Sequence, residues 1–206
     1  MNRTPARHRR AGAAAGAASR SSIAVRLTRP ARAVVAAALL AATAMHAPPV
    51  AAQVPPTPAE VAAYRGLHAA AHHGDLAAIA RLAGTKAALE ARDAHGRTPL
   101  HVATFARRRD AVRALLAAGA DSAALESGRY DAVTIAAVAD DEATLHVLLE
   151  HGASAALVTS RYDGTALIAA AHLGHDGVVR RLIAAGAPLD HVNNLHWTAL
   201  IEAIVL

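Results

Sequence analysis

The sequence of 206 residues contains no cysteine. It can therefore form no disulfide, and thiol catalysis and zinc sites with cysteine ligands are excluded. Aromatic residues are also scarce, at 2% of the chain, although 54% of the residues are hydrophobic. Alanine supplies most of that hydrophobic content, and alanine favours helices that approach one another closely. The composition predicts a core of many thin helical layers without bulky aromatic anchors.

The chain also lacks the short motifs of common catalytic sites. It has no Gly-x-Ser-x-Gly elbow, no glycine-rich phosphate loop ending in Gly-Lys-Ser/Thr, and no His-Glu-x-x-His helix. The acidic run Asp140-Asp141-Glu142 falls at an exposed corner between two expected helices, where nothing raises a carboxyl pKa for acid catalysis. We therefore predict no catalytic residue, no cofactor and no enzymatic activity.

Positive charge is concentrated at the N-terminus. Residues 1–52 hold eight of the 21 lysines and arginines and none of the 16 acidic residues. The remaining 13 basic residues against 16 acidic ones leave a net charge of −3 from residue 53 onward. A nucleic acid partner, which the net charge of +5 would suggest, is therefore not expected for the folded part.

An apolar run of 13 residues, from Ala33 to Met45, follows the basic segment. It is shorter than the ~20 residues with which a helix crosses a bilayer, so no stable membrane span is expected in the mature chain. The small residues Val50-Ala51-Ala52 offer a cleavage site before Gln53. We predict that residues 1–52 are a signal peptide with a basic leader and that the protein is exported, to the periplasm or beyond. A short membrane anchor and a disordered leader are the alternatives.

Proline is frequent just after this segment, with five prolines between residues 48 and 58. Proline stiffens an extended chain, so residues 53–63 are predicted to be a rigid linker.

From Tyr64 the sequence repeats itself. Apolar anchor residues recur at spacings of 33, 33, 34 and 33, namely Leu67, Leu100, Val133, Leu167 and Leu200. A second apolar pair recurs later in the period, as Leu115-Leu116, Leu148-Leu149 and Leu182-Ile183, and is followed by Gly119, Gly152 and Gly186. Thr98 and Pro99 suit the start of a helix, and these glycines suit a left-handed residue at a helix end.

This period and these residues resemble the ankyrin repeat, most closely from Asp93 to Asp121, which contains Thr98-Pro99-Leu100-His101 and Gly119-Ala120-Asp121. The first unit has Lys86 in place of the terminal glycine, and the third has Asp131 at the threonine position. The resemblance implies an all-α solenoid of about five helix-turn-helix units with β-turn or finger loops. The units are 64–92 (a degenerate cap), 93–126, 127–158, 159–192 and 193–206 (truncated).

The sequence stops at Ile204-Val205-Leu206, inside the first helix of the fifth unit. A terminal unit of a solenoid should present a polar outer face. We therefore expect the sequence to be a fragment or a truncated product, and a capped form to be a monomer.

Charged triplets occupy the same corner one unit apart, as Arg107-Arg108-Arg109 and Asp140-Asp141-Glu142. One hypothesis is a complementary ladder that fixes the stacking register. The alternative is two solvated corners, each pair contributing under ~1 kcal/mol.

Histidines number 13, and His68, His72 and His73 lie within one expected helix turn and a half. Positions four apart share a helix face, which is one requirement for a metal site. However, His68 and His101 take the histidine position of the repeat, which the resemblance assigns a structural hydrogen bond. No acidic or cysteine ligand completes a set, and we predict no metal site.

The resemblance implies that partners contact the turn tips and the exposed face of the first helix. The tips are Arg97, Arg129, Tyr130, Arg161, Tyr162 and Trp197, and the helix face contributes His72, Phe105, Val138 and His172. Tyrosine, tryptophan and arginine are favoured as interface anchors. In addition, a core this rich in alanine has little need of aromatic residues. The alternative is that Phe105 and Val138 pack between units while the tyrosines cover the turns.

We therefore predict a non-catalytic protein–protein interaction module with an unknown protein partner. The alternatives are a secreted effector that binds host proteins, the binding part of a larger periplasmic enzyme, and an accessory protein for a metal or small molecule.

Overall fold

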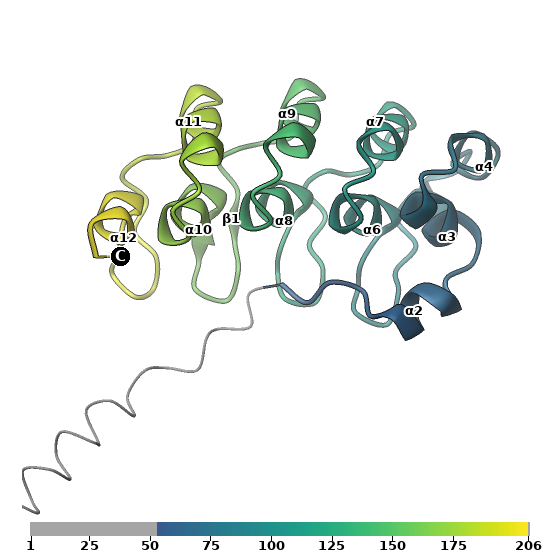
Figure 1. The fold of residues 1–206 in the computed structure, drawn as a ribbon, viewed down its shortest axis with the longest axis horizontal. Coiled ribbons are helices and arrows are strands. Elements are labelled where there is room, and N and C mark those ends of the chain that lie inside the picture. The colour runs from purple at the N-terminus through teal and green to yellow at the C-terminus, as the bar shows by residue number, and fades with distance from the viewer. Residues whose placement is uncertain (1–52, 206) are drawn as a thin grey trace, which may run out of the picture. The chain divides into compact units, whose positions relative to one another are not determined.

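A computed structural model describes residues 53–205; the predicted signal peptide, residues 1–52, and Leu206 lie outside the described residues. The helices form an inner and an outer row (Figure 1). The inner row contains α3 (Gly66–His73), α6 (Pro99–Phe105), α8 (Ala132–Val138), α10 (Ala166–His172) and α12 (Ala199–Val205). The outer row contains α4 (Leu76–Leu82), α7 (Arg109–Ala117), α9 (Glu142–Glu150) and α11 (Asp176–Ala184). Two further helices are α2 (Pro58–Ala63) and α5 (Lys86–Leu89).

Contacts between neighbouring units join the rows. Each inner helix packs on the inner helix of the next unit, from α3 to α12, and the outer helices α4, α7, α9 and α11 pack on one another in the same order. One continuous apolar cluster runs through these contacts, with alanines at the centres of the inner helices and leucines between the rows. The predicted all-α solenoid of helix-turn-helix units is confirmed.

Helix ends follow the local chemistry of the repeat. The side chain of Thr98 accepts a hydrogen bond from the His101 amide, and Pro99 is the first residue of α6. In the third unit, Asp131 provides the same cap to the Thr134 amide at 2.8 Å, so a carboxylate replaces the threonine without loss of the cap. Gly119 follows the outer helix α7 with a φ of 93°, as predicted for a left-handed residue.

The fingers, which connect each outer helix to the next inner helix, are joined in a ladder of backbone hydrogen bonds. The amides of Ser127, Ser160 and Asn194 donate to carbonyl oxygens of the preceding finger, at 2.9, 2.8 and 2.9 Å. The finger between the third and fourth units contains the antiparallel strands β1 (Val158–Thr159) and β2 (Gly164–Thr165). The fingers of neighbouring units therefore stack on one another, as the helices do.

The corners between inner and outer helices are not held by the proposed charge ladder. Among residues 53–205, no ion pair joins the arginine triplet to the acidic triplet. Instead, Arg107 Nη2 donates to the Ala139 carbonyl at 2.5 Å, and Arg108 Nε donates to the His72 carbonyl at 3.0 Å. The Asp141 carboxylate caps α9 at the Thr144 amide. The ladder hypothesis is wrong, because Arg107 and Arg108 bond backbone carbonyls, Asp141 caps α9, and Glu142 pairs with Arg181.

The buried side chain of His101 links α6 to the loop that follows α7. The Thr98 amide donates to Nδ1 at 3.0 Å, so Nδ1 is unprotonated and Nε2–H donates to the Ala124 carbonyl at 3.0 Å. Only the neutral ring satisfies both bonds. Burial lowers the pKa of His101 to about 4, against an ordinary value of 6.5.

The approach of two fingers at Gly96 yields a first prediction. Gly96 has a φ of 69°, and an added Cβ would lie 2.9 Å from Ser127 Oγ and 3.2 Å from the Ser127 amide nitrogen. Gly119 also has a positive φ, but no atom lies within 4 Å of an added Cβ. We expect Gly119→Ala to cost about 1 kcal/mol of stability from backbone strain alone. Gly96→Ala should cost about 1–3 kcal/mol more from overpacking, measured by urea unfolding. Equal losses would show that the fingers do not pack closely.

A second prediction concerns the loss of folding stability at acidic pH. Because the folded pKa of His101 lies below the unfolded value, its contribution to stability is complete above pH 6.5 and is lost as the pH falls toward 4. The loss approaches about 3 kcal/mol at about 1.4 kcal/mol per pKa unit. His101→Thr, which copies Thr134 of the next unit, should be less stable at pH 7 and lose less stability on acidification. If the free energy of unfolding of wild type and of His101→Thr fell equally with pH, His101 would not be the source of the acid sensitivity.

Candidate functional site

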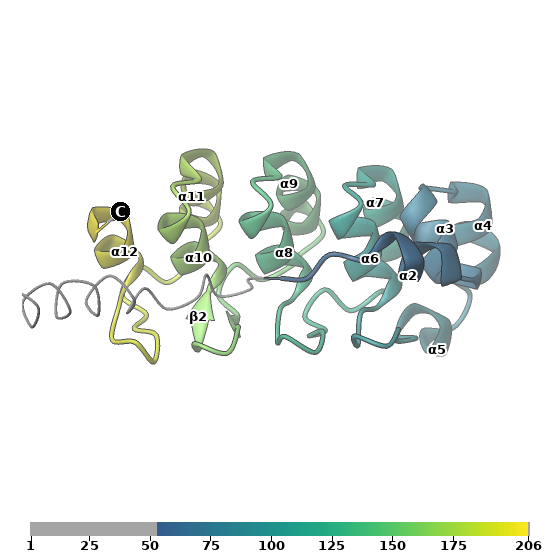
Figure 2. The same cartoon turned by 60° about the horizontal axis from the view of Figure 1, so that its bottom comes forward.

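The ends of the inner helices and the fingers together form one surface, which we call the concave surface. His72, Phe105, Val138 and His172 take equivalent positions at or next to the last residue of α3, α6, α8 and α10. His172 is exposed and the other three are half-buried. Figure 2 shows these helices side by side, with the fingers in a parallel row beside them. The structure therefore brings the predicted helix-face residues into one line.

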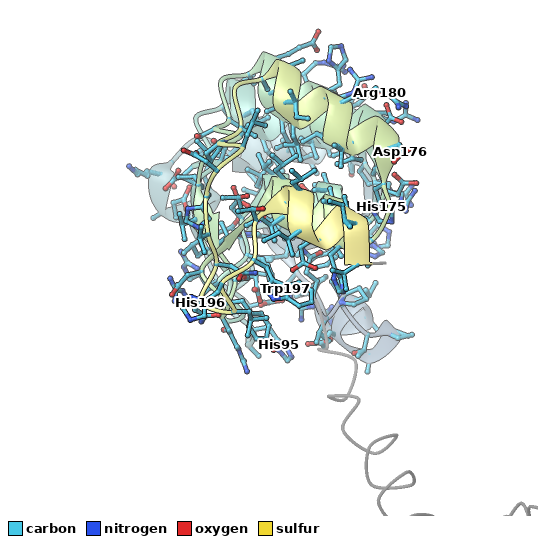
Figure 3. The ribbon with its side chains drawn as sticks, turned by 90° about the vertical axis from the view of Figure 1, so that its left-hand side faces the viewer. His95, His175, Asp176, Arg180, His196 and Trp197 are labelled. Atoms are coloured by element: carbon cyan, nitrogen blue, oxygen red, sulfur yellow. The ribbon has the colours of Figure 1, made fainter. Side chains whose placement is uncertain are left out.

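The finger residues of the prediction differ in exposure. Arg129 and Arg161 are exposed, Tyr162 and Trp197 are half-buried, and Tyr130 is buried with 8% of its surface exposed. Figure 3 shows Trp197 at the finger end of the stack, opposite the corner residues His175 and Asp176. Tyr130 thus covers its own turn, as the alternative interpretation held, whereas Arg161, Tyr162 and Trp197 present surface to solvent.

Arg97 corrects the prediction of an exposed tip, because its side chain is fully buried. Its Nε donates to Asp93 Oδ2 at 2.8 Å, its Nη2 to Glu60 Oε1 at 2.6 Å, and its Nη1 to the Val54 carbonyl at 3.2 Å. The Tyr64 hydroxyl donates to the same Asp93 oxygen at 2.8 Å. We call this group, Val54, Glu60, Tyr64, Asp93 and Arg97, the arginine clamp.

The clamp holds the segment that was predicted to be a linker. Within residues 53–63, α2 begins at a capping box in which Thr57 and Glu60 bond each other's backbone amides. Glu60 also lies 2.7 Å from His95 Nε2, on the finger of the second unit. The segment therefore contains a helix and packs against the first two units, which corrects the prediction of an extended, rigid linker. The spacing Thr57-Pro58-Ala59-Glu60 is a capping-box signal that the sequence reasoning missed.

The clamp carboxylates are ionised at neutral pH. Burial alone would raise the pKa of Asp93, but the hydrogen bonds from the Arg97 backbone and the Tyr64 hydroxyl, with the Arg97 charge, hold it below its usual value. The backbone bond at Thr57 lowers the pKa of Glu60, and the charges of Arg97 and His95 add to this effect. Burial and the bond to Asp93 raise the pKa of Tyr64, so its hydroxyl stays protonated. The single buried guanidinium is thus matched by two carboxylates.

The histidines of the first unit are arranged as a packed group. His72 and His73 stack edge to face with ring centres 5.1 Å apart, and His72 Nδ1 is buried without a hydrogen-bond partner. Burial lowers the pKa of His72, and the charges of His73 and Arg108 act in the same direction. Among the described residues, no three His, Asp or Glu side chains group to hold a metal ion.

Between residues 53 and 205 no helix has the length and apolar character that crossing a bilayer requires.

Comparisons with known proteins agree on one family. Residues 57–125 and 133–206 match the family described as ankyrin repeats (3 copies). The ankyrin repeat protein YahD of Escherichia coli K12 is 29% identical over 138 residues, which cover 66% of this chain and 68% of YahD. The neurogenic locus notch homolog protein 1 of Xenopus laevis is 32% identical over 118 residues, which cover 54% of this chain and 5% of that protein.

One solved structure also superposes on this chain. The crystal structure of an ankyrin repeat domain from Acinetobacter baumannii AYE is 44% identical in sequence and superposes with a TM-score of 0.63. The match covers 68% of this chain and 71% of that domain.

The clamp yields a third prediction. Glu60→Gln removes one of the two carboxylates beside the buried Arg97, so we expect a loss of about 1–3 kcal/mol in urea unfolding. Amide exchange in α2 should also become faster, because the segment loses its attachment. Asp110→Asn is the control, since Asp110 is 75% exposed and its one ion pair within residues 53–205 is with the exposed Arg113. This variant should cost less than about 1 kcal/mol. Similar losses in the two variants, with unchanged exchange in α2, would refute the clamp.

Proposed function

The chain belongs to the ankyrin-repeat family, and from this premise we propose that its concave surface binds a protein partner without catalysing a reaction. Ankyrin repeats are protein–protein interaction modules, and the family is generally non-catalytic. The observation that carries the proposal is a set of exposed or half-buried side chains on the third to fifth units. These are Arg129, Arg161, Tyr162, His172 and Trp197.

These residues have the chemistry of interface anchors. Tyrosine, tryptophan and arginine combine a large contact area with a polar group, and they dominate measured binding energies at interfaces. The Arg161 guanidinium has no hydrogen bond or ion pair within residues 53–205. Since the core is filled by alanine, leucine and valine, these larger side chains are not needed for stacking. Their positions support a binding role.

The first two units differ from the rest of the surface. The segment from Val54 to Ala63 already lies against the second finger through Arg97 and His95. A partner therefore meets the third to fifth units first, and Arg97 is not among its contacts.

Export is part of the proposal. Its support is the basic segment, the apolar run from Ala33 to Met45 and the small residues before Gln53. The destination is the periplasm or the exterior, where the module serves as a scaffold for its partner.

A second possibility is that the repeats are the binding part of a longer protein. The matching region makes up only 5% of the Xenopus notch homolog, so repeats of this kind occur within much longer chains.

The test is affinity capture from cytoplasmic, periplasmic and culture fractions of the source organism. Wild type, Arg161→Glu and Tyr162→Ala are compared with Arg180→Glu, an exposed outer-helix arginine that matches the charge change. A stoichiometric protein should bind wild type and Arg180→Glu, and each concave-surface variant should weaken it by about 1–2 kcal/mol or more. Equal capture by all four folded proteins would overturn the proposed surface.

The same fractions test export. The intact mass of the chain in the exported fraction should correspond to a start at Gln53. Recovery only from the cytoplasm, with residues 1–52 attached, would refute export.

A further inference from the structure

A hollow at the corner between the first two units has four arginines among its eight lining residues. It has a volume of about 470 Å³ and lies between the end of α3 and the start of α7. Its walls include His73, Arg107, Arg108, Arg109 and Arg113. This concentration stands out because residues 53–206 carry a net charge of −3. The hollow therefore creates a local positive field on an otherwise acidic body.

The arginines are partly fixed in place. Arg107 and Arg108 are each anchored to a backbone carbonyl of a neighbouring unit, which neutralises none of their charge. Asp110 is the acidic residue of the lining, and it bonds Arg113 at 2.6 Å. The Arg109 side chain has no hydrogen bond or ion pair in the described part of the chain. Four arginines and one aspartate thus line the hollow.

The cationic corner is a property of the second unit and not of the repeat. The outer helices α4 and α9 begin at Asp75 and Asp141, which cap them, whereas Arg108 takes this position in α7 and forms no side-chain cap. The fourth unit has Asp176 and Arg180 at the positions of Arg109 and Arg113, so opposite charges alternate there (Figure 3). Stacking therefore does not require this row of arginines.

Backbone geometry also distinguishes this position from the first and fourth units. Arg107 has a φ of 52°, where those units place Gly74 and Gly174, and Asp140 of the third unit has a φ of 51°. A residue other than glycine is destabilised by a left-handed backbone conformation. Arg107 therefore occupies this position despite the backbone strain.

We propose that this hollow binds the carboxylates of an acidic protein segment. Guanidinium groups pair with carboxylates through two parallel hydrogen bonds, and several arginines in a row suit an extended run of Asp or Glu. The four arginines are exposed, so the side chains of an acidic segment can reach them. The site lies at the corner, away from the finger residues of the concave surface, and it does not depend on the function proposed above.

The test uses the whole chain and fluorescein-labelled hexaglutamate, with hexaglutamine as the uncharged control peptide. Arg109→Gln/Arg113→Gln removes two guanidinium groups and leaves the bonds of Arg107 and Arg108 to neighbouring units intact. Lys86→Gln/Arg180→Gln removes the same charge at exposed positions outside the hollow. The first variant should bind hexaglutamate about tenfold more weakly than wild type at low salt, and the second less than about twofold more weakly. Hydrogen exchange should show protection of residues 107–113 by the peptide in wild type.

Three results would overturn the site. Equal weakening by the two double variants would show attraction by net charge alone. Protection confined to residues outside 73–113 would place the peptide elsewhere, including on the basic residues 1–52 that all variants share. Complete displacement of hexaglutamate by inorganic phosphate at constant ionic strength would identify a site for a single small anion instead of an acidic segment.

Discussion

No unit of this protein can bury its own apolar face, and every other feature depends on that constraint. An inner helix of seven or eight residues and an outer helix of seven to nine present apolar sides that only the next unit covers. Alanines at the centres of the inner helices allow the close approach, and leucines fill the space between the rows. The stack sets the spacing of the fingers, corners and helix ends.

Fixed spacing lets one position serve different purposes. The residue before the inner-helix cap is Arg97 in the second unit, Tyr130 in the third and Trp197 in the fifth. Arg97 is buried in a clamp, Tyr130 covers its turn, and Trp197 is half-buried. Since the stack tolerates all three, this position can vary for binding without a change of fold. The corner behaves similarly, with Asp75, Arg108, Asp141 and His175 at equivalent places.

The sequence allowed prediction of what is local and periodic. Caps such as Thr98 and the glycines after outer helices follow from chemistry within a few residues, and the stacked rows follow from the 33-residue period. The clamp could not be predicted in this way, because Glu60 lies 37 residues from Arg97 and before the first repeat unit. The charge ladder failed for a related reason: opposite charges side by side in the register have competing backbone partners, and Asp141 is already committed as a helix cap. Arg161, Tyr162 and Trp197 were placed correctly at the surface, whereas Arg97 was not.

Native-state hydrogen exchange of the whole chain tests the stacking account most directly. If neighbours supply the stability of each unit, amides of α6 and α8, which have units on both sides, should exchange through one shared opening with the highest free energy. Amides of α12 should exchange at a lower free energy, since the described chain places a neighbour on only one of its sides. Exchange of α8 at the same low free energy as α12, or separate opening of each helix pair, would contradict the account.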